Sequence, residues 1–363
     1  MKLASVTPAE GKDRTYSVAV GNGALEYLPE LLAKKKYTKI ALVTEPTVRK
    51  LFAHELARVL GTGVSLEVFE VPSGESAKTV EVLQSLWRSY SDMRFDRSSL
   101  SLHLGGGALG DIAGFAAATF QRGIDYIQIP TTLLAQVDAS IGGKLAINFG
   151  GAKNQVGVVR QPQAVVADTA LLSSLSLRDF RSGVSEMIKH GIILSSHHFE
   201  ALEEKALDSS DQEALERLVF ESIELKASVV AADPEEADLR KVLNAGHTFG
   251  HAFESLAFDM NIPLLHGEAV SIGLIAEAKL ACLRGLLPVE CFERIEKCVE
   301  RQGLPTRLSF EFDLDKLFDL LLRDKKNRNN QIRWVLPKKI GDTERDVICS
   351  REEIEAASRY VCK

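Results

Sequence analysis

The stretch SSLSLHLGGGALGDIAGFAAATF at residues 98–120 decides the fold. It opens with a short apolar run typical of a buried strand, continues with three glycines, and ends in small residues that predict a helix. Other strand-like segments at 38–45, 63–71 and 125–132 alternate with helix-like ones. Strands that alternate with helices of this length predict an α/β fold with a doubly wound, largely parallel sheet.

The pattern changes near residue 175. Helical periodicity dominates after it, with a short strand pair expected within 331–342 and a final helix at 351–360. The sequence therefore predicts two domains, an α/β domain at 1–175 and a mainly α-helical domain at 176–363. Because ligands commonly bind between domains, we expect the site in the cleft between these halves.

Composition limits the classes of function. The chain has 363 residues, a net charge of −6 and no long basic run, which argues against nucleic acid as a partner. No apolar stretch is long enough to suggest a membrane span, and the first residues lack the apolar core of a signal peptide. The five cysteines are odd in number and form no CxxC pair, which fits a reducing compartment, so we expect a cytoplasmic protein.

Gly105, Gly106 and Gly107 lie between the central strand and its helix. Such a turn lets backbone N–H groups approach a pyrophosphate, and the helix N-terminus adds partial positive charge. The string GGGALGD is not the GxGxxG fingerprint, so a tight turn that only serves packing stays open. A second turn, PTTLLAQVD, begins at Pro130 just past the next strand, where ligands bind in open α/β sheets.

A candidate metal set comes from the second half. His247 and His251 lie one helical turn apart in LNAGHTFGHAFE, His266 follows in LLHGEAV, and Glu186 precedes His190 by one turn. Imidazoles and a carboxylate are suitable ligands for zinc or a similar divalent ion. The spacing alone leaves a surface or packing role open, and the absence of Glu after His247 excludes the HExxH protease helix.

Cations and amides gather on the same motifs. A cluster of this kind suits an anionic substrate that carries both a phosphate and a carboxylate, although any one lysine is commonly a solvated side chain. The members are Lys144, Lys153, Asn154, Lys189, Lys226, Arg240 and Asn244.

These strings occur together in one known family. GGGALGDIAGFAAATFQRGIDYIQIPTTLLAQVDASIGGK, KNQVG, SEMIKHG, LNAGHTFGHAFE, LHGEAVSIG and DKKN resemble, in order and spacing, the 3-dehydroquinate synthases of the sugar phosphate cyclase superfamily. The resemblance covers nearly the whole chain and is densest from 104 to 273. It implies a Rossmann-like N-terminal domain that binds NAD, an α-helical C-terminal domain that binds metal and substrate, and a homodimer.

The resemblance also implies roles for individual residues. Metal ligands are expected at Glu186, His247 and His266. NAD contacts are expected at Glu45, Thr47, Glu75, Lys78, Gly106, Gly107, Asp111, Thr131, Thr132, Leu134, Lys144 and Lys153. Catalytic roles are expected for Asp138, Lys144, Lys189, Arg240, Asn244 and His251, with proton transfer or phosphate contact at His251. Substrate contacts are expected at Arg122, Lys144, Lys153, Asn154, Lys226, Arg240, Asn244, Lys325 and Lys326, with Arg122 reaching a neighbouring subunit.

The implied reaction converts 3-deoxy-D-arabino-heptulosonate 7-phosphate (DAHP) to 3-dehydroquinate and phosphate in the shikimate pathway. NAD and a divalent metal, zinc or cobalt, would serve a transient oxidation, β-elimination, reduction, ring opening and aldol closure, so the enzyme is a lyase. Three positions depart from the family's pattern: Leu145 replaces the usual Thr, Leu-Ser-Leu at 175–177 replaces a Leu-Pro turn, and Glu45 replaces a frequent Asp.

Three alternatives stay open. A sister cyclase, such as a 2-epi-5-epi-valiolone or 2-deoxy-scyllo-inosose synthase, would lack carboxylate-binding cations, yet Lys226, Arg240 and Asn244 are present. A metal-dependent polyol dehydrogenase would carry out net oxidation of an uncharged alcohol and accumulate NADH. A catalytically inactive NAD-binding or scaffold protein would stay inactive when metal and NAD are restored.

Overall fold

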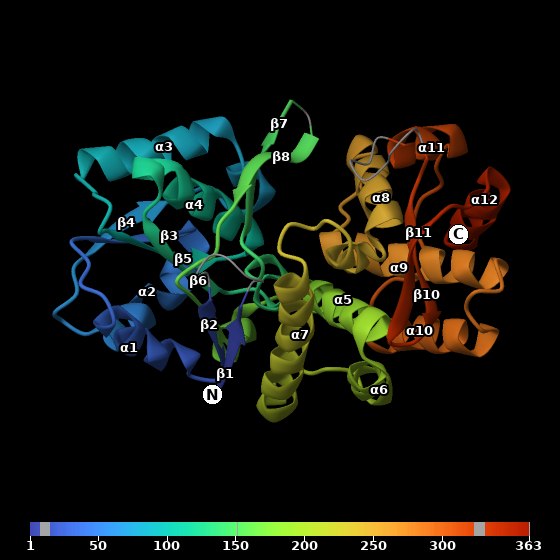
Figure 1. Cartoon of the computed structure of the whole chain (residues 1–363), viewed down its shortest axis with the longest axis horizontal. Helices are drawn as coiled ribbons and strands as arrows, with labels where there is room; N and C mark the ends of the chain where they lie inside the picture. Colours follow the sequence, from blue (N-terminus) through green and yellow to red (C-terminus); the bar gives the residue numbers. More distant parts are fainter. Residues whose placement is uncertain (8–14, 151, 323–330, 363) are drawn as a thin grey trace. The chain divides into compact units, whose positions relative to one another are not determined.

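The computed structural model describes residues 1–7, 15–150, 152–322 and 331–362. The chain forms two compact units (Figure 1). Unit 1 comprises residues 1–176 and 209–231, and unit 2 comprises 177–208 and 232–363. The domain boundary expected near residue 175 stays a prediction. In the structure, residues 209–231 of the predicted second domain belong to unit 1.

Unit 1 is built on a seven-stranded sheet whose strands are parallel except for the antiparallel β1–β2 pair. The spatial order is β1-β2-β9-β6-β5-β3-β4. The strands are β1 (Lys2–Val6), β2 (Tyr16–Gly21), β3 (Ile40–Thr44), β4 (Leu66–Glu70), β5 (Leu100–Gly105), β6 (Asp125–Pro130) and β9 (Ala164–Asp168). Every residue of β5 is buried, as expected for a central parallel strand that is covered on both faces.

Helices cover both faces of this sheet. One core contains Leu28 and Leu56 with Leu100, Leu102 and Leu104 of β5. A second core, on the other face, contains residues of α3, α4 and the strands. The helices are α1 (Leu28–Ala33), α2 (Pro46–Leu60), α3 (Val80–Asp92), α4 (Gly107–Thr119) and α7 (Gln212–Ala232). The predicted α/β architecture of the N-terminal part is therefore confirmed.

A hairpin of β7 (Lys144–Phe149) and β8 (Ala152–Val159) follows the sheet's sixth strand and was not identified from the sequence. Leu145 and Ile147 point into the core beside α4, whereas Lys144, between buried Gly143 and Leu145, is exposed. The period-2 alternation that defines a strand is present over only these few residues, between glycine-rich turns, which explains why the pattern was not recognised.

Unit 2 is mainly helical, as predicted. Its helices are α5 (Leu177–Leu194), α6 (Ser196–Glu204), α8 (His247–Asp259), α9 (His266–Leu283), α10 (Val289–Arg301), α11 (Leu314–Leu322) and α12 (Arg351–Tyr360). Strands β10 (Trp334–Lys339) and β11 (Asp342–Val347) form an antiparallel pair before the last helix. A strand pair was expected here, but its second strand lies beyond the predicted range of 331–342 except for Asp342. Helix α9 is buried on nearly all sides because α5, α8, α10, α12 and β10 pack around it.

Residues 239–258 show helical periodicity in the sequence, but the structure forms two elements there. A 3-10 turn at Leu239–Asn244 is followed by α8, and Gly246 between them has a φ of 77°. A left-handed residue cannot continue an α-helix, and glycine adopts it without the steric penalty of a Cβ. The break makes His247 the first residue of α8.

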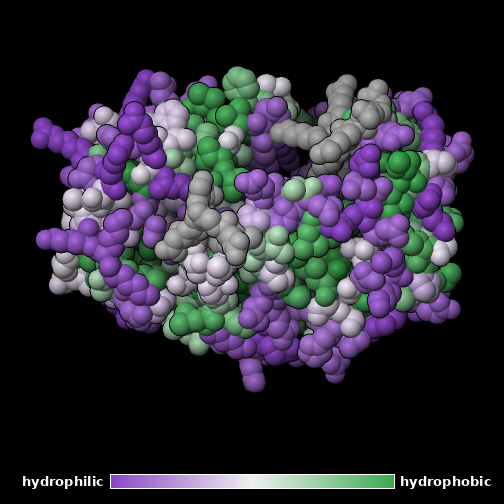
Figure 2. Space-filling view, viewed as in Figure 1, coloured by the Kyte–Doolittle hydropathy of each residue, from purple (hydrophilic) through white to green (hydrophobic). Residues whose placement is uncertain are grey.

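The surface is of mixed polarity. Hydrophilic and hydrophobic residues alternate over short distances on the face drawn in Figure 2, as on most folded domains. Among the described residues, no helix is both long and apolar enough to cross a membrane.

Candidate active site

The glycine-rich turn lies at the carboxyl edge of the sheet of unit 1. Helix α4 begins at Gly107, and no side chain among the described residues caps its N-terminus. The first backbone N–H groups of a helix have no partner within it, so they can bind an anion there. A Cβ on Gly106 would lie 3.4 Å from Cγ2 of Thr132, and one on Gly107 would lie 3.0 Å from Cβ of Ala139. The lack of a Cβ at these glycines therefore lets Thr132 and Ala139 pack closely against the start of α4.

This turn coincides with the point at which the strand order reverses. The chain passes from β3 outward to β4, returns to β5 on the other side of β3, and continues to β6. Open α/β sheets bind ligands at such a switch point. Oε1 of Glu45, just after β3, would lie 3.2 Å from a Cβ on Gly105, and Thr131 N donates to Gly105 O at 3.0 Å. Sequence-predicted NAD contacts from three strand ends thus lie beside one another.

The remaining predicted NAD contacts on this edge differ in exposure. Thr131 is buried, Thr132 and Leu134 are half-buried, and Thr47 in the first turn of α2 is exposed. Thr132 Oγ1 accepts a hydrogen bond from Ala135 N at 3.2 Å, which fixes the threonine beside Gly106.

Lys78 contacts three other predicted site residues. Its Nζ is 2.6 Å from Oδ2 of Asp111, donates to Oδ1 of Asn154 and lies 3.8 Å from Oε1 of Glu75. Lys78 is only 3% exposed. Burial raises the pKa of Asp111 to about 6, and the charge of Lys78 opposes this rise. The structure therefore joins three predicted NAD contacts to one predicted substrate contact, Asn154.

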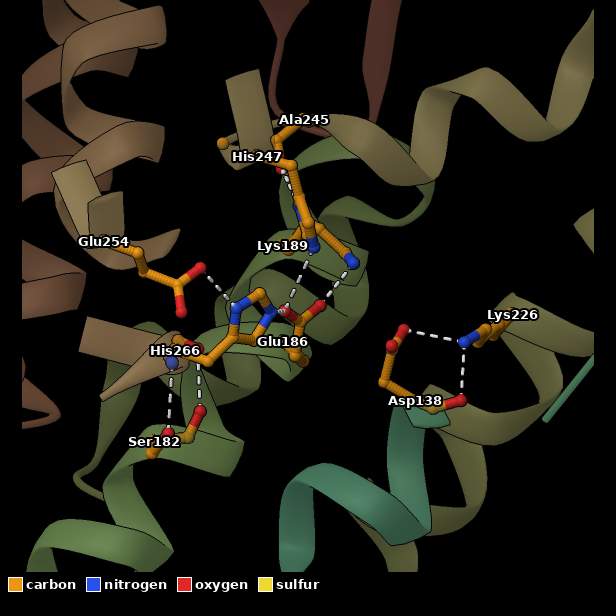
Figure 3. A network of polar contacts seen from close by, with 12 residues as sticks. Asp138, Ser182, Glu186, Lys189, Lys226, Ala245, His247, Glu254 and His266 are labelled. Carbon is orange, nitrogen blue, oxygen red and sulfur yellow. Dashed lines mark hydrogen bonds and ion pairs between the residues drawn. The ribbon is translucent and has the colours of Figure 1, made fainter. Parts of the chain in front are cut away.

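A second ion pair in unit 1 joins Lys226 of α7 to Asp138 (Figure 3). Lys226 Nζ donates to Oδ1 of Asp138 at 2.8 Å and to its backbone oxygen at 2.5 Å, and Lys226 is 6% exposed. Two hydrogen bonds to one residue fix the direction of this ammonium group. By contrast, the predicted substrate contacts Lys144, Lys153 and Arg122 are exposed.

Glu186, His247 and His266 converge in unit 2, as Figure 3 shows. Nε2 of His247 and Nε2 of His266 each lie 3.7 Å from Oε1 of Glu186. Two ligand atoms that are each about 2.1 Å from a tetrahedral zinc are roughly 3.4 Å apart. The spacing of the three groups therefore fits one divalent ion.

The other nitrogen of each imidazole has its own partner. His247 Nδ1 lies 3.1 Å from Ala245 O, and His266 Nδ1 lies 3.1 Å from Oε2 of Glu254. In a neutral imidazole, an Nδ1–H that is bound in this way leaves the lone pair of Nε2 available to a metal, which is the usual arrangement around metal-binding histidines. The tautomers of the two histidines and the spacing of the three groups therefore both fit a divalent ion.

Other predicted residues of unit 2 surround these three groups. Lys189 forms an ion pair with Glu186, and both are almost fully buried. The ring of His251 is exposed and its centroid lies 5.3 Å from that of His247. This places His251 next to the three predicted ligands, at a position that solvent reaches.

The loop before α8 fixes Arg240 and Asn244. Asp233 accepts a hydrogen bond from Arg240 N at 2.9 Å, and Arg240 Nη1 donates to Pro234 O at 3.1 Å. Asn244 Nδ2 donates to Oε1 of Glu236 at 3.2 Å. Arg240 is 2% exposed. The two further predicted substrate contacts, Lys325 and Lys326, lie outside the described residues.

Comparison with known proteins identifies the family. The family models described as 3-dehydroquinate synthase N-terminal and C-terminal match residues 68–182 and 183–327. A 3-dehydroquinate synthase of Sulfurovum sp. is 42% identical over 338 residues, covering 92% of this chain and 91% of that protein. One from Halorhodospira halophila is 42% identical over 334 residues, covering 91% and 92%. The chain belongs to the 3-dehydroquinate synthase family.

Solved structures agree with this family fold. A 2-deoxy-scyllo-inosose synthase complexed with carbaglucose-6-phosphate, NAD+ and Co2+ has a TM-score of 0.89 at 26% identity, covering 99% of this chain and 100% of its own. A 2-epi-5-epi-valiolone synthase from Streptomyces hygroscopicus with NAD+ and Zn2+ bound has a TM-score of 0.87 at 28% identity, covering 97% and 98%. Both are similar to this 3-dehydroquinate synthase family member along nearly its whole length.

Two carboxylates around the metal set were missed in the sequence. Glu254 follows His247 by seven residues on the same face of α8, so helical periodicity could have indicated it. Glu277 of α9 accepts a hydrogen bond from Gly246 N at 2.5 Å and is 1% exposed. It lies thirty positions from His247 in the sequence, and no local pattern indicates this contact.

Leu145, the family member's main departure near the site, faces away from the predicted substrate residues. It is 4% exposed in the core beside α4, and its Cδ2 would lie 2.4 Å from a Cβ on Gly114. Alternate residues of a strand point to opposite faces, so Lys144 and Leu145 are directed to different surroundings. The hydroxyl of the family's usual Thr is absent here, and the leucine side chain packs against Gly114 instead.

Proposed function

We propose that this chain is a 3-dehydroquinate synthase that converts DAHP to 3-dehydroquinate and phosphate. The observation that carries the proposal is the Glu186–His247–His266 set with both Nε2 atoms facing the carboxylate, in a chain of this family. Lyases of this kind catalyse one step of the shikimate pathway, which leads to chorismate and aromatic amino acids.

NAD and one divalent ion, zinc or cobalt, are the cofactors. Glu45, Gly106, Gly107, Asp111, Thr131 and Thr132 would hold the dinucleotide at the switch point, and Glu186, His247 and His266 would hold the ion. Together these groups supply a transient oxidation of the substrate and Lewis acidity at its hydroxyl group, which make loss of phosphate by β-elimination feasible. Because the oxidation is reversed within the cycle, the net reaction is redox neutral.

The chain's own cations would bind the two anionic groups of DAHP. Lys226 and Arg240 are buried, and each is held by hydrogen bonds that fix its direction, so they lose little further freedom when a carboxylate binds. Asn244 adds an amide donor beside Arg240. Lys144, Lys153, Asn154 and Lys189 are assigned to the phosphate and the ring hydroxyls as further substrate contacts.

His251 is assigned to proton transfer. Its ring lies beside both histidine ligands, with centroids 5.3 Å from His247 and 6.0 Å from His266, and it is exposed. An imidazole in reach of solvent can exchange a proton with water, which an acid–base group must do in every cycle.

A homodimer in the cytoplasm completes the proposal. Arg122 is exposed and has a φ of 66°, next to Gln121 with a φ of 52°. Two consecutive left-handed residues outside glycine hold the arginine in a strained turn, which is common at functional sites. Phe149, Val156, Val158 and Val159 of the β7–β8 hairpin expose apolar side chains that a second copy would cover.

The substrate itself distinguishes this function from that of a sister cyclase, which the high TM-scores keep as a second candidate. We would compare phosphate release from DAHP and from a ketoheptulose 7-phosphate without the carboxylate. A 3-dehydroquinate synthase prefers DAHP, and Arg240→Ala lowers kcat/KM for DAHP while leaving NAD affinity within about twofold. A preference for the substrate without a carboxylate would assign the chain to the sister cyclases.

A further inference from the structure

Three residues of unit 1 form a closed ring of hydrogen bonds. Asn148 of β7 donates its backbone N–H to Lys78 O at 2.9 Å. Oδ1 of Asn148 accepts from Asn154 N at 2.9 Å, and Lys78 Nζ donates to Oδ1 of Asn154. The ring joins the segment before α3 to both strands of the β7–β8 hairpin.

The side-chain amide of Asn148 also reaches outside the ring. Its Nδ2 donates to Oε1 of Glu75 at 2.8 Å, while Oδ1 is used by Asn154. This position requires an acceptor and a donor side by side, which an amide provides. A carboxylate here would face the carboxylate of Glu75 with like charge, and an aliphatic side chain would bind neither neighbour.

Asn154 needs this support because of its backbone. Its φ is 51°, in the left-handed region, and asparagine is among the few residues besides glycine that adopt it. Such conformations persist when the surrounding contacts determine them. Asn148 binds the main chain of Asn154 and Lys78 binds its side chain, so both parts are held.

The residues that Asn148 contacts are proposed to bind different ligands. Glu75 and Lys78 belong to the NAD-binding set, and Asn154 belongs to the substrate-binding set on the hairpin. We propose that Asn148 is a positioning residue that orients Asn154 for the substrate and couples substrate binding to occupancy of the Glu75–Lys78 segment by NAD. This inference rests on the proposed function of the two sets.

Two variants separate the two contacts of the amide. Asn148→Ala removes both. Asn148→Asp has the same shape and can still accept from Asn154 N, but it loses the contact to Glu75 and repels it. Gln155→Ala, on β8 of the same hairpin, is the matched control, because its side chain is exposed. The isosteric variant carries the test if Asn148→Ala does not fold.

The experiment uses the full chain loaded with zinc. The affinity for NAD is measured by calorimetry without and with a saturating phosphonate analogue of DAHP, whose methylene group replaces the ester oxygen and prevents elimination. The ratio of the two affinities is the coupling factor. The KM for DAHP is measured at saturating NAD, and melting temperature and zinc content report folding.

The wild type and Gln155→Ala should show a coupling factor of about ten, within the usual range for coupled sites. Asn148→Ala should reduce it to near one and raise KM about tenfold, with NAD affinity in the absence of the analogue within about twofold. Asn148→Asp should lose the coupling but keep KM closer to that of the wild type. A purely structural role would lower the melting temperature and weaken both affinities equally.

Two results overturn the inference in different ways. If wild-type protein releases phosphate from DAHP but the coupling factor of Asn148→Ala matches that of the wild type, the positioning role is wrong and the proposed function stands. If wild-type protein releases no phosphate from DAHP, the proposed function fails and this inference fails with it.

Discussion

Nδ1 of His266 lies 3.1 Å from Oε2 of Glu254, on the side of the ring away from Glu186. Glu254 is half-buried on α8, whereas His266 begins α9, so the contact joins the two helices that carry the predicted histidine ligands. A carboxylate on the far nitrogen fixes the ring and makes the near nitrogen a better metal ligand. Glu254 therefore orients the ring of His266, one of the predicted metal ligands.

Replacing Glu254 should weaken metal binding. Glu254→Ala should lower zinc affinity about 10- to 100-fold, and Glu254→Gln, which can still accept from Nδ1–H, should lower it less. Zinc affinity is measured by competition with a chromophoric chelator. Glu290→Gln on α10, an exposed acid, serves as the control. Unchanged affinity in Glu254→Ala would show that this carboxylate does not act on the ligand.

Arg122 should act in the partner's site. Arg122→Ala and His247→Ala homodimers are each expected to be nearly inactive, the first through lost phosphate contact and the second through lost metal. Random mixing of the two chains should restore roughly a quarter of wild-type activity, because half of the dimers then contain one intact site. Activity is measured on the unselected mixture of dimers after co-expression of the two chains. No recovery, or a fully active monomer, would contradict a role across subunits.

Leu145 and Gly114 should depend on each other for stability. Gly114→Ala introduces a clash with Leu145 and should cost about 1–3 kcal/mol of unfolding free energy. Leu145→Thr should cost about 2–3 kcal/mol, because it leaves a gap and buries a hydroxyl. The double variant should be more stable than the sum predicts by about 1 kcal/mol or more. Urea denaturation measures each value.

The same variant tests the link between Leu145 and substrate choice. Because the side chain faces the core, Leu145→Thr should keep kcat/KM for DAHP within about threefold. Additive free energies together with a large change in kcat/KM would place Leu145 at the substrate instead.

His103 should make the protein less stable in acid. It lies in β5, stacked on Tyr126, with Nε2 bound to Ser101, and burial lowers its pKa to about 3. The unfolded chain binds this proton near pH 6.5 and the folded chain only near pH 3. Neutral His103 therefore imposes no loss in the free energy of unfolding above pH 6.5, and this free energy falls progressively as the pH drops from 6.5 toward 3.

The expected size follows from the linkage relation. Between pH 7 and pH 5 the loss should be about 2 kcal/mol. Urea denaturation of His103→Leu should show a shallower fall with pH by that amount, whereas His54→Gln at an exposed site should leave the slope unchanged. Equal slopes in wild type and His103→Leu would show that His103 is protonated in the folded state.

The sequence predicts the scaffold well where one local pattern dominates. The apolar run of β5, the glycines and the small residues of α4 predict a strand, turn and helix, and the structure confirms each. The β7–β8 hairpin is not predicted from the sequence, because its inward-facing residues are few and lie between glycines. Burial of Leu145 depends on Gly114, thirty-one positions away, which no local pattern encodes.

The candidate site divides in the same way. Helical spacing pairs His247 with His251, and residue type adds Glu186 and His266 from other helices as candidate ligands. The choice of Glu186, His247 and His266 as the ligand set comes from the resemblance to the family. The contact of Glu277 with Gly246 depends entirely on how α9 packs against α8. The ion pair of Asp138 with Lys226 likewise joins residues that are far apart in the sequence.

A 3-dehydroquinate synthase converts DAHP without net oxidation at a site that needs both NAD and a metal. We would measure phosphate release from DAHP by the purified chain, with NAD and zinc present and with each withheld, while absorbance at the NADH band is recorded. We expect phosphate release only when both are present, with no accumulation of NADH. Release without one of them, or NADH formed in proportion to substrate consumed, would contradict this expectation.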